Sequence, residues 1–359
     1  MKKQIFSPGR MELAGNHTDH QNGRVIAGAL DSGIFAQYEA NNSGVIRINS
    51  VGFKPIEINI KQLSVRTGEF GMSKALVRGM VSGFKDLGLK VGGFDAVTKS
   101  TLPIGSGLSS SAAFSVLVGR ILNDIYNNNE AQPIVIARTA QQAENVFFGK
   151  PCGLQAQLTI ALGKTVYLDF KTGEIEPLKA DFASMGLTMC LTETGGSHAG
   201  LDTSYARIPA DMVYIANIFD KGVLGDVDPE EFRKKGWDPT SRPVRRATHF
   251  FDENERVPKM RDALKNSDGE TYMRLMNESG RSSEKLLTNV YTSVTDDTKL
   301  TEGLALSAKL LEGKGAWRVH GGGFAGCVQA LMPTDFYAEY KLRMEERFGE
   351  GSCRKMKLL

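Results

Sequence analysis

A glycine- and serine-rich segment, PIGSGLSSSAA at 103–113, most constrains how this chain can fold. The residues before it, GGFDAVTKS, alternate as a strand does, and Ser109 to Asn128 carries apolar residues at helical spacing. Gly105 and Gly107 permit the sharp backbone turn that must join the two elements. The segment therefore predicts a strand, a tight glycine loop and a long helix in sequence.

The start of that helix is predicted to bind phosphate. The first N–H groups of a helix lack internal acceptors, and the helix dipole is positive at that end. No lysine follows at Walker spacing, which excludes a P-loop of that class. An ordinary glycine turn with serine caps remains an alternative for these residues alone. The residues expected to contact the phosphates are Gly105, Ser106, Gly107, Leu108, Ser109, Ser110 and Ser111.

The rest of the chain predicts an α+β protein. Its 359 residues suffice for about two domains. Residues 24–60 are typical of strands, 164–178 of a hairpin, and the chain is mainly helical from about 204, including separate helices at 243–252 and 256–265. We expect a boundary near 175–200 and divide the chain into domains 1–180 and 181–359.

Composition excludes several classes of protein. The net charge of +3 gives no reason to expect a nucleic-acid partner, and no apolar run is long enough for a membrane helix or a secretory signal. Four widely spaced cysteines form no CxxC pair, so we expect reduced thiols and a cytoplasmic location. We further expect a monomer whose partners are small molecules.

Three segments together resemble a known family. PIGSGLSSSAA looks like the second motif of the GHMP kinases, and HGGGFAGCVQA at 320–330 resembles their third motif, GxGFGGC. SPGRMELAGNHTDHQNG at 7–23 resembles the galactokinase signature, usually PGRVNLIGEHTDYNxG. The resemblance implies a two-domain GHMP-kinase architecture, with a mixed sheet and helices first and a helix-rich α+β domain second. It also implies an ATP- and Mg²⁺-dependent kinase that phosphorylates the anomeric hydroxyl of galactose or a related sugar.

The resemblance assigns roles residue by residue. Arg10 would stabilise the transferred phosphoryl group, and Ser111 with Glu144 would hold Mg²⁺. Each assignment has a structural alternative: a solvated Arg10, a solvent-facing Glu144, or simple packing of the third-motif turn. The expected sugar-binding residues are Asn16, His17, Asp19, Gly153 and Tyr205, and the third-motif turn consists of Gly321, Gly322 and Gly323.

One departure bears on catalysis. The galactokinase run PCGIMDQ reads PCGLQAQ here, so Ala156 stands at the catalytic aspartate position, and residues 145–168 contain no acidic residue. General base catalysis is worth about 10²–10⁴-fold, so loss of the base alone is consistent with a slow kinase. The alternative is a silent sensor that binds sugar and ATP, and a weaker one is a related enzyme acting on a non-sugar alcohol. Asn16, at a glutamate of the signature, leaves the identity of the sugar open.

Overall fold

The computed structural model describes residues 2–102, 107–197, 200–292, 294 and 296–359. A seven-stranded sheet occupies the N-terminal half, in the order β4-β3-β5-β2-β6-β7 with β1 also paired to β2. Only the β3–β5 pair is parallel. Its strands are β1 (Lys3–Ala14), β2 (Arg24–Asn41), β3 (Val45–Ser50), β4 (Ile56–Asn59), β5 (Gly93–Ser100), β6 (Val166–Asp169) and β7 (Glu174–Pro177).

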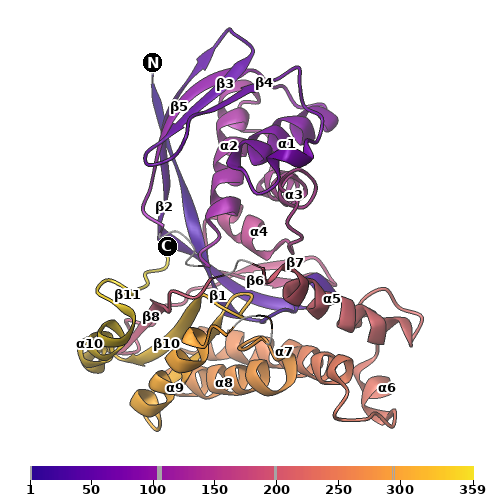
Figure 1. Cartoon of the computed structure of the whole chain (residues 1–359), viewed down its shortest axis with the longest axis vertical. Coiled ribbons are helices and arrows are strands. Elements are labelled where there is room, and N and C mark those ends of the chain that lie inside the picture. Colours follow the sequence, from indigo (N-terminus) through magenta and orange to yellow (C-terminus); the bar gives the residue numbers. More distant parts are fainter. Residues whose placement is uncertain (1, 103–106, 198–199, 293, 295) are drawn as a thin grey trace.

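Four helices cover one face of this sheet (Figure 1). The predicted helix after the glycine-rich segment is confirmed as α2, and the predicted hairpin at 164–178 is confirmed as β6 and β7. A π-helical turn, Ala143–Phe148, continues α3 toward the loop before α4. The helices are α1 (Ser73–Asp86), α2 (Ser110–Tyr126), α3 (Pro133–Gln142) and α4 (Gln155–Leu162).

The C-terminal half pairs a smaller antiparallel sheet with most of the remaining helices, drawn in the lower part of Figure 1. Its strand order is β11-β8-β10-β9. The strands are β8 (Leu187–Glu193), β9 (Ala316–His320), β10 (Cys327–Pro333) and β11 (Cys353–Lys355). The helices are α5 (Asp202–Asn217), α6 (Pro229–Lys234), α7 (Arg242–Lys265), α8 (Gly269–Ser282), α9 (Lys299–Leu311) and α10 (Tyr337–Phe348).

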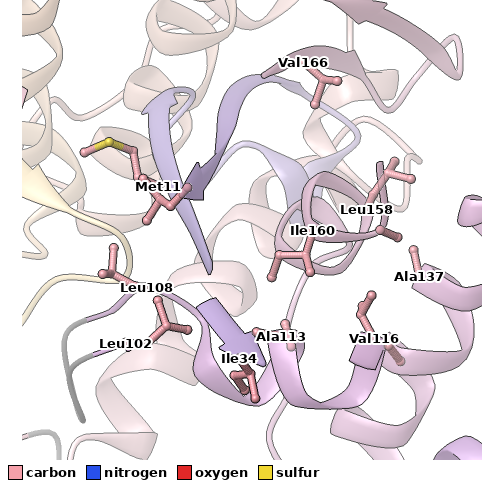
Figure 2. Packing of buried hydrophobic residues seen from close by; sticks show 14 of the residues in the cluster. Met11, Ile34, Leu102, Leu108, Ala113, Val116, Ala137, Leu158, Ile160 and Val166 are labelled. Atoms are coloured by element: carbon pink, nitrogen blue, oxygen red, sulfur yellow. The ribbon is translucent and has the colours of Figure 1, made fainter. Parts of the chain in front are cut away.

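The main apolar core holds the site-bearing segments together. Figure 2 shows Met11 of β1, Leu108 and Ile160 of α4 within one cluster. Leu108 belongs to the glycine- and serine-rich segment before α2, here called the phosphate loop. The cluster also includes residues of β8, α7 and α8, so apolar packing is continuous across residue 180. The predicted α+β fold is confirmed, and the structure builds it with two sheets. The domain boundary at 180/181 stays a prediction.

The expectation of two helices at 243–252 and 256–265 is wrong, because α7 runs unbroken through Pro258. A proline inside a helix leaves the carbonyl four residues earlier without its N–H donor. Here that carbonyl belongs to Asn254, and Nη1 of Arg24 donates to it at 3.4 Å. The side-chain oxygen of Asn254 also accepts from the Arg24 N–H at 2.7 Å. This substitute bonding lets the helix continue and ties it to the start of β2.

In the part of the chain that the structure describes, the helices lack the combination of length and apolarity needed to cross a bilayer. Cys152, Cys190, Cys327 and Cys353 are all free thiols, as expected.

Candidate functional site

Arg10 lies on β1 between two irregularities in its pairing with β2, which fall between Pro8 and Arg10 and between Glu12 and Ala14. Such bulges redirect side chains and are common beside active sites. The Arg10 residue is half-buried, so the alternative of a freely solvated arginine is wrong. Burial lowers the pKa of Arg10, and the nearby carboxylates of Glu12, Asp19 and Glu144 oppose that effect. The guanidinium stays charged because its ordinary pKa is so high.

Asp19 and Gly153 lie in direct contact, although they are far apart in sequence. A Cβ at position 153 would lie 1.8 Å from Oδ2 of Asp19, so only glycine leaves room for this carboxylate. Asp19 is partly exposed, and its Oδ1 accepts from the backbone N–H of His20 at 2.9 Å. A carboxylate held this way can accept from the hydroxyls of a sugar. The structure therefore brings two of the predicted sugar-binding residues together.

The side chains of His17 and Asn16 form hydrogen bonds mainly with other residues of the protein. His17 has a left-handed backbone (φ 59°), and its ring nitrogens lie 3.2 Å from His20 Nε2 and 3.0 Å from the carbonyl of Gly322. Asn16 donates to Gly321 at 2.7 Å and to Glu12 at 3.1 Å. Its Oδ1 accepts from Ser283 and Asn289. The amide is thus fully bonded within the protein, and sugar contact by Asn16 stays a prediction.

Ser111 and Glu144 are side by side, as a shared metal would require. Oγ of Ser111 donates to Oε1 of Glu144 at 2.8 Å, and Gln157 Nε2 donates to Oε2 at 2.9 Å. Glu144 is only 3% exposed, so the alternative of a solvent-facing glutamate is wrong. A hydroxyl and a carboxylate are oxygen ligands of the kind Mg²⁺ prefers, and Mg²⁺ usually keeps several waters as well. The pair therefore fits Mg²⁺, although no group of three or more metal-binding side chains occurs among the described residues.

The phosphate loop is described from Gly107 onward, and the predicted contacts Gly105 and Ser106 lie outside the described residues. Ser109 takes a left-handed conformation (φ 60°) immediately before α2, where the unpaired N–H groups of the first turn are available. Leu108 is buried in the core, and its carbonyl accepts from the Arg10 N–H at 3.2 Å. The loop and β1 are therefore joined directly.

The third-motif turn packs closely on Tyr205. The Tyr205 hydroxyl donates to the carbonyl of Gly323 at 2.7 Å, and a Cβ at Gly322 would lie 2.9 Å from the tyrosine ring. A Cβ at Gly323 would come within 2.0 Å of the Asn289 carbonyl oxygen, so this position also requires glycine. This close packing agrees with the structural alternative for the turn, and contact between Tyr205 and sugar stays a prediction.

Ala156 is the second residue of α4 and packs against the main core. The structure supplies no carboxylate there, and Arg10 Nε is buried without a hydrogen-bond partner among the described residues. Gln155 Nε2 and Gln157 Oε1, on either side of Ala156, are also buried without partners in that part of the chain. Unpaired buried polar atoms are costly and often mark places where a ligand or water binds.

The sequence interpretation missed a buried charge network beneath the loop after β1 that carries Asn16, His17 and Asp19, here called the sugar loop. Arg318 is 1% exposed and pairs with Glu12 at 3.2 Å and, more weakly, with Glu253 at 3.9 Å. Glu253 also accepts from the Gly15 and Asn16 N–H groups. Burial alone would raise the pKa of Glu253, but Arg256, His249 and Arg318 lower it to about 2. The network holds the sugar loop against α7 and β9.

Two members of this region exchange the residues of the galactokinase signature. Glu12 stands where PGRVNLIGEHTDYNxG has asparagine, and Asn16 stands where it has glutamate. The two side chains hydrogen-bond at 3.1 Å, so the cluster still contains one carboxylate and one amide. Comparing both positions with the signature would have given the signal for this pair.

Comparison with known proteins agrees with these motifs. Residues 3–39 match the galactokinase galactose-binding signature, and residues 75–164 match the GHMP kinases N terminal domain. A galactokinase of Clostridium acetobutylicum is 30% identical over 96% of this chain and 89% of its own length. A galactokinase of Bacillus subtilis is 29% identical over 96% and 89%. The Lactococcus lactis galactokinase complexed with galactose shares the fold with a TM-score of 0.85, at 24% identity over 99% of this chain and 93% of that one.

Proposed function

The chain belongs to the galactokinase family of GHMP kinases and is a sugar kinase, and from this premise we propose that it transfers phosphate from ATP to the anomeric hydroxyl of galactose or a close relative. One observation carries the proposal. Arg10 interacts electrostatically both with Asp19 on the sugar loop and with Glu144 beside the phosphate loop. A single guanidinium thus lies near enough to feel the charge of a group expected to hold each of the two substrates.

Positioning and charge compensation account for most of the proposed mechanism. Phosphoryl transfer through a loose transition state requires in-line alignment and positively charged groups beside the negatively charged phosphoryl group. The N–H groups at the start of α2 would bind the ATP phosphates, and Arg10 would compensate the charge that develops between donor and acceptor. Asp19, with Gly153 behind it, would orient the sugar by accepting from its hydroxyls.

The family's usual base for deprotonating the attacking hydroxyl is absent, because Ala156 occupies its position. In a loose transition state the proton leaves late, so its transfer to solvent lowers the rate without abolishing it. We therefore propose a kinase slower than one with aspartate at this position.

Ser111 and Glu144 are the residues we propose for Mg²⁺. A bound Mg²⁺ would neutralise charge on the phosphate oxygens. Gln157 donates to the second oxygen of Glu144 and so would keep the carboxylate oriented toward Ser111.

The decisive experiment is an ADP-release assay across a panel of hexoses with ATP and Mg²⁺, comparing the chain with Arg10→Ala. We expect turnover with galactose or one of its epimers that falls by at least 100-fold in the variant, since the positive charge that stabilises the transition state is removed. If the turnover of the unsubstituted chain is no higher than that of Arg10→Ala with any sugar of the panel, the kinase proposal is refuted. Calorimetric binding of both ligands without turnover would instead support the sensor, which the kinase relatives do not favour.

A further inference from the structure

His320, the last residue of β9, is a buried histidine that the mechanism above does not use. It is 3% exposed, and its Nε2 accepts a hydrogen bond from the backbone N–H of Glu12 at 3.1 Å. A backbone amide can only donate, so Nε2 must carry the lone pair and the ring proton must be on Nδ1. Burial, together with the positive charges of Arg10 and Arg318, lowers the pKa of His320 well below its usual value. The ring is therefore neutral, and Nδ1–H is its only donor.

That donor has no partner among the described residues. It faces the phosphate loop: a Cβ at Gly107 would lie 3.5 Å from Nδ1. Nη1 of Arg10 approaches the same residue, 3.5 Å from the Gly107 carbonyl. A buried donor without an acceptor costs about 1–3 kcal/mol, so a protein retains one chiefly where something else supplies the acceptor.

We propose that His320 Nδ1–H donates a hydrogen bond to a terminal phosphate oxygen of ATP, alongside the Arg10 guanidinium. The inference rests on the proposed function, because that function places a triphosphate at Gly107. Phosphate oxygens only accept hydrogen bonds, which suits a neutral ring whose unpartnered nitrogen only donates. The same tautomer excludes His320 as a substitute for the missing base, because its lone pair is already bonded to Glu12.

Two substitutions separate the functions of the two ring nitrogens. In His320→Gln the amide oxygen can replace Nε2 as the acceptor for Glu12, while the donor at the Nδ1 position is lost. In His320→Asn the amide nitrogen can replace Nδ1, while the acceptor for Glu12 is lost. By calorimetry with Mg²⁺ and without sugar, we expect His320→Gln to weaken ATP binding by about 10- to 100-fold and ADP binding by less than about threefold. His320→Asn should retain most of the ATP affinity.

Several results would overturn the proposal. Equal losses of affinity for ATP and ADP would show that the Nδ1–H donor stabilises the phosphate loop and does not bind the terminal phosphate. Unchanged ATP affinity in a folded His320→Gln would show that the donor makes no contact with ATP. ATP affinity lost equally in both variants, with unfolding midpoints preserved, would assign His320 a structural role. Because binding is measured without sugar, these results do not depend on turnover, and the hexose assay tests the kinase proposal separately.

A measurement on the unsubstituted chain covers the case in which the variants do not fold. In protein labelled with ¹⁵N-histidine, we expect the His320 Nδ1–H resonance to shift on addition of ATP but not of ADP. The same resonance unmoved by ATP would refute the hydrogen bond.

Discussion

Gly153→Ala should weaken sugar binding by moving the Asp19 carboxylate. The new methyl carbon would lie 1.8 Å from Oδ2 and 2.5 Å from Cγ of Asp19. Ordinary contact requires roughly 3.5 Å, so the carboxylate must retreat by more than ~1.5 Å. The backbone at 153 does not have a positive φ, so alanine adds no backbone strain there.

The size of the effect follows from what the displacement breaks. A carboxylate that accepts from two sugar hydroxyls gains about 1.5–3 kcal/mol from each. A displacement of ~1.5 Å takes both bonds beyond hydrogen-bonding distance. We therefore expect galactose affinity to fall by about 10²–10⁴-fold, with ATP affinity unchanged.

Calorimetry with galactose and with ATP, in separate titrations, measures both effects. Gly236→Ala is the matched control, because a Cβ there meets nothing within 4 Å. In an Asp19→Ala background the substitution at 153 should cause no further loss, since its effect acts through that carboxylate. Galactose affinity retained in folded Gly153→Ala, or losses that add in the double variant, would refute the reasoning.

Three further predictions concern the base, the buried network and pH. Ala156→Asp should raise kcat by about 10²–10⁴-fold by restoring a proton acceptor and a partner for Arg10, and steady-state kinetics showing no increase would contradict this. Arg318→Met should lower the free energy of unfolding by about 3–5 kcal/mol, because it leaves Glu12 buried and unpaired; a loss below 1 kcal/mol in denaturant titration would contradict the buried pair. Burial lowers the pKa of His249, so the unfolded chain binds the proton more readily. This histidine's contribution to stability should therefore be full above its unfolded pKa of about 6.5 and fall by at most about 1.4 kcal/mol per pH unit below it. In urea unfolding, the loss of stability between pH 7.5 and 5 should be smaller for His249→Gln than for the unsubstituted chain, and an equal loss would contradict this.

Local patterns predicted the elements around the phosphate loop well. The helix α2 begins where a serine run follows glycine, and β6–β7 form where the sequence alternates around Thr172-Gly173. Long-range pairing was not predictable in this way. The substitute donor that lets α7 pass through Pro258 comes from Arg24, more than two hundred residues earlier.

In the candidate site, too, some contacts could be predicted from the sequence and others could not. Family motifs predicted that Ser111 and Glu144 would meet, and they do. They did not predict the role of His320, whose tautomer is set by the backbone of Glu12 on another sheet. Such a role depends on which atoms the fold brings together, and residue spacing does not contain that information.

The exchanged pair Glu12 and Asn16 restricts the evolutionary routes open to this sugar loop. A chain changing one position at a time from the signature would pass through either two carboxylates or two amides. The first places like charges within about 3 Å of each other, and the second leaves Arg318 without its nearer buried partner. We therefore expect either single exchange in this chain, Glu12→Asn or Asn16→Glu, to destabilise it more than the double exchange does.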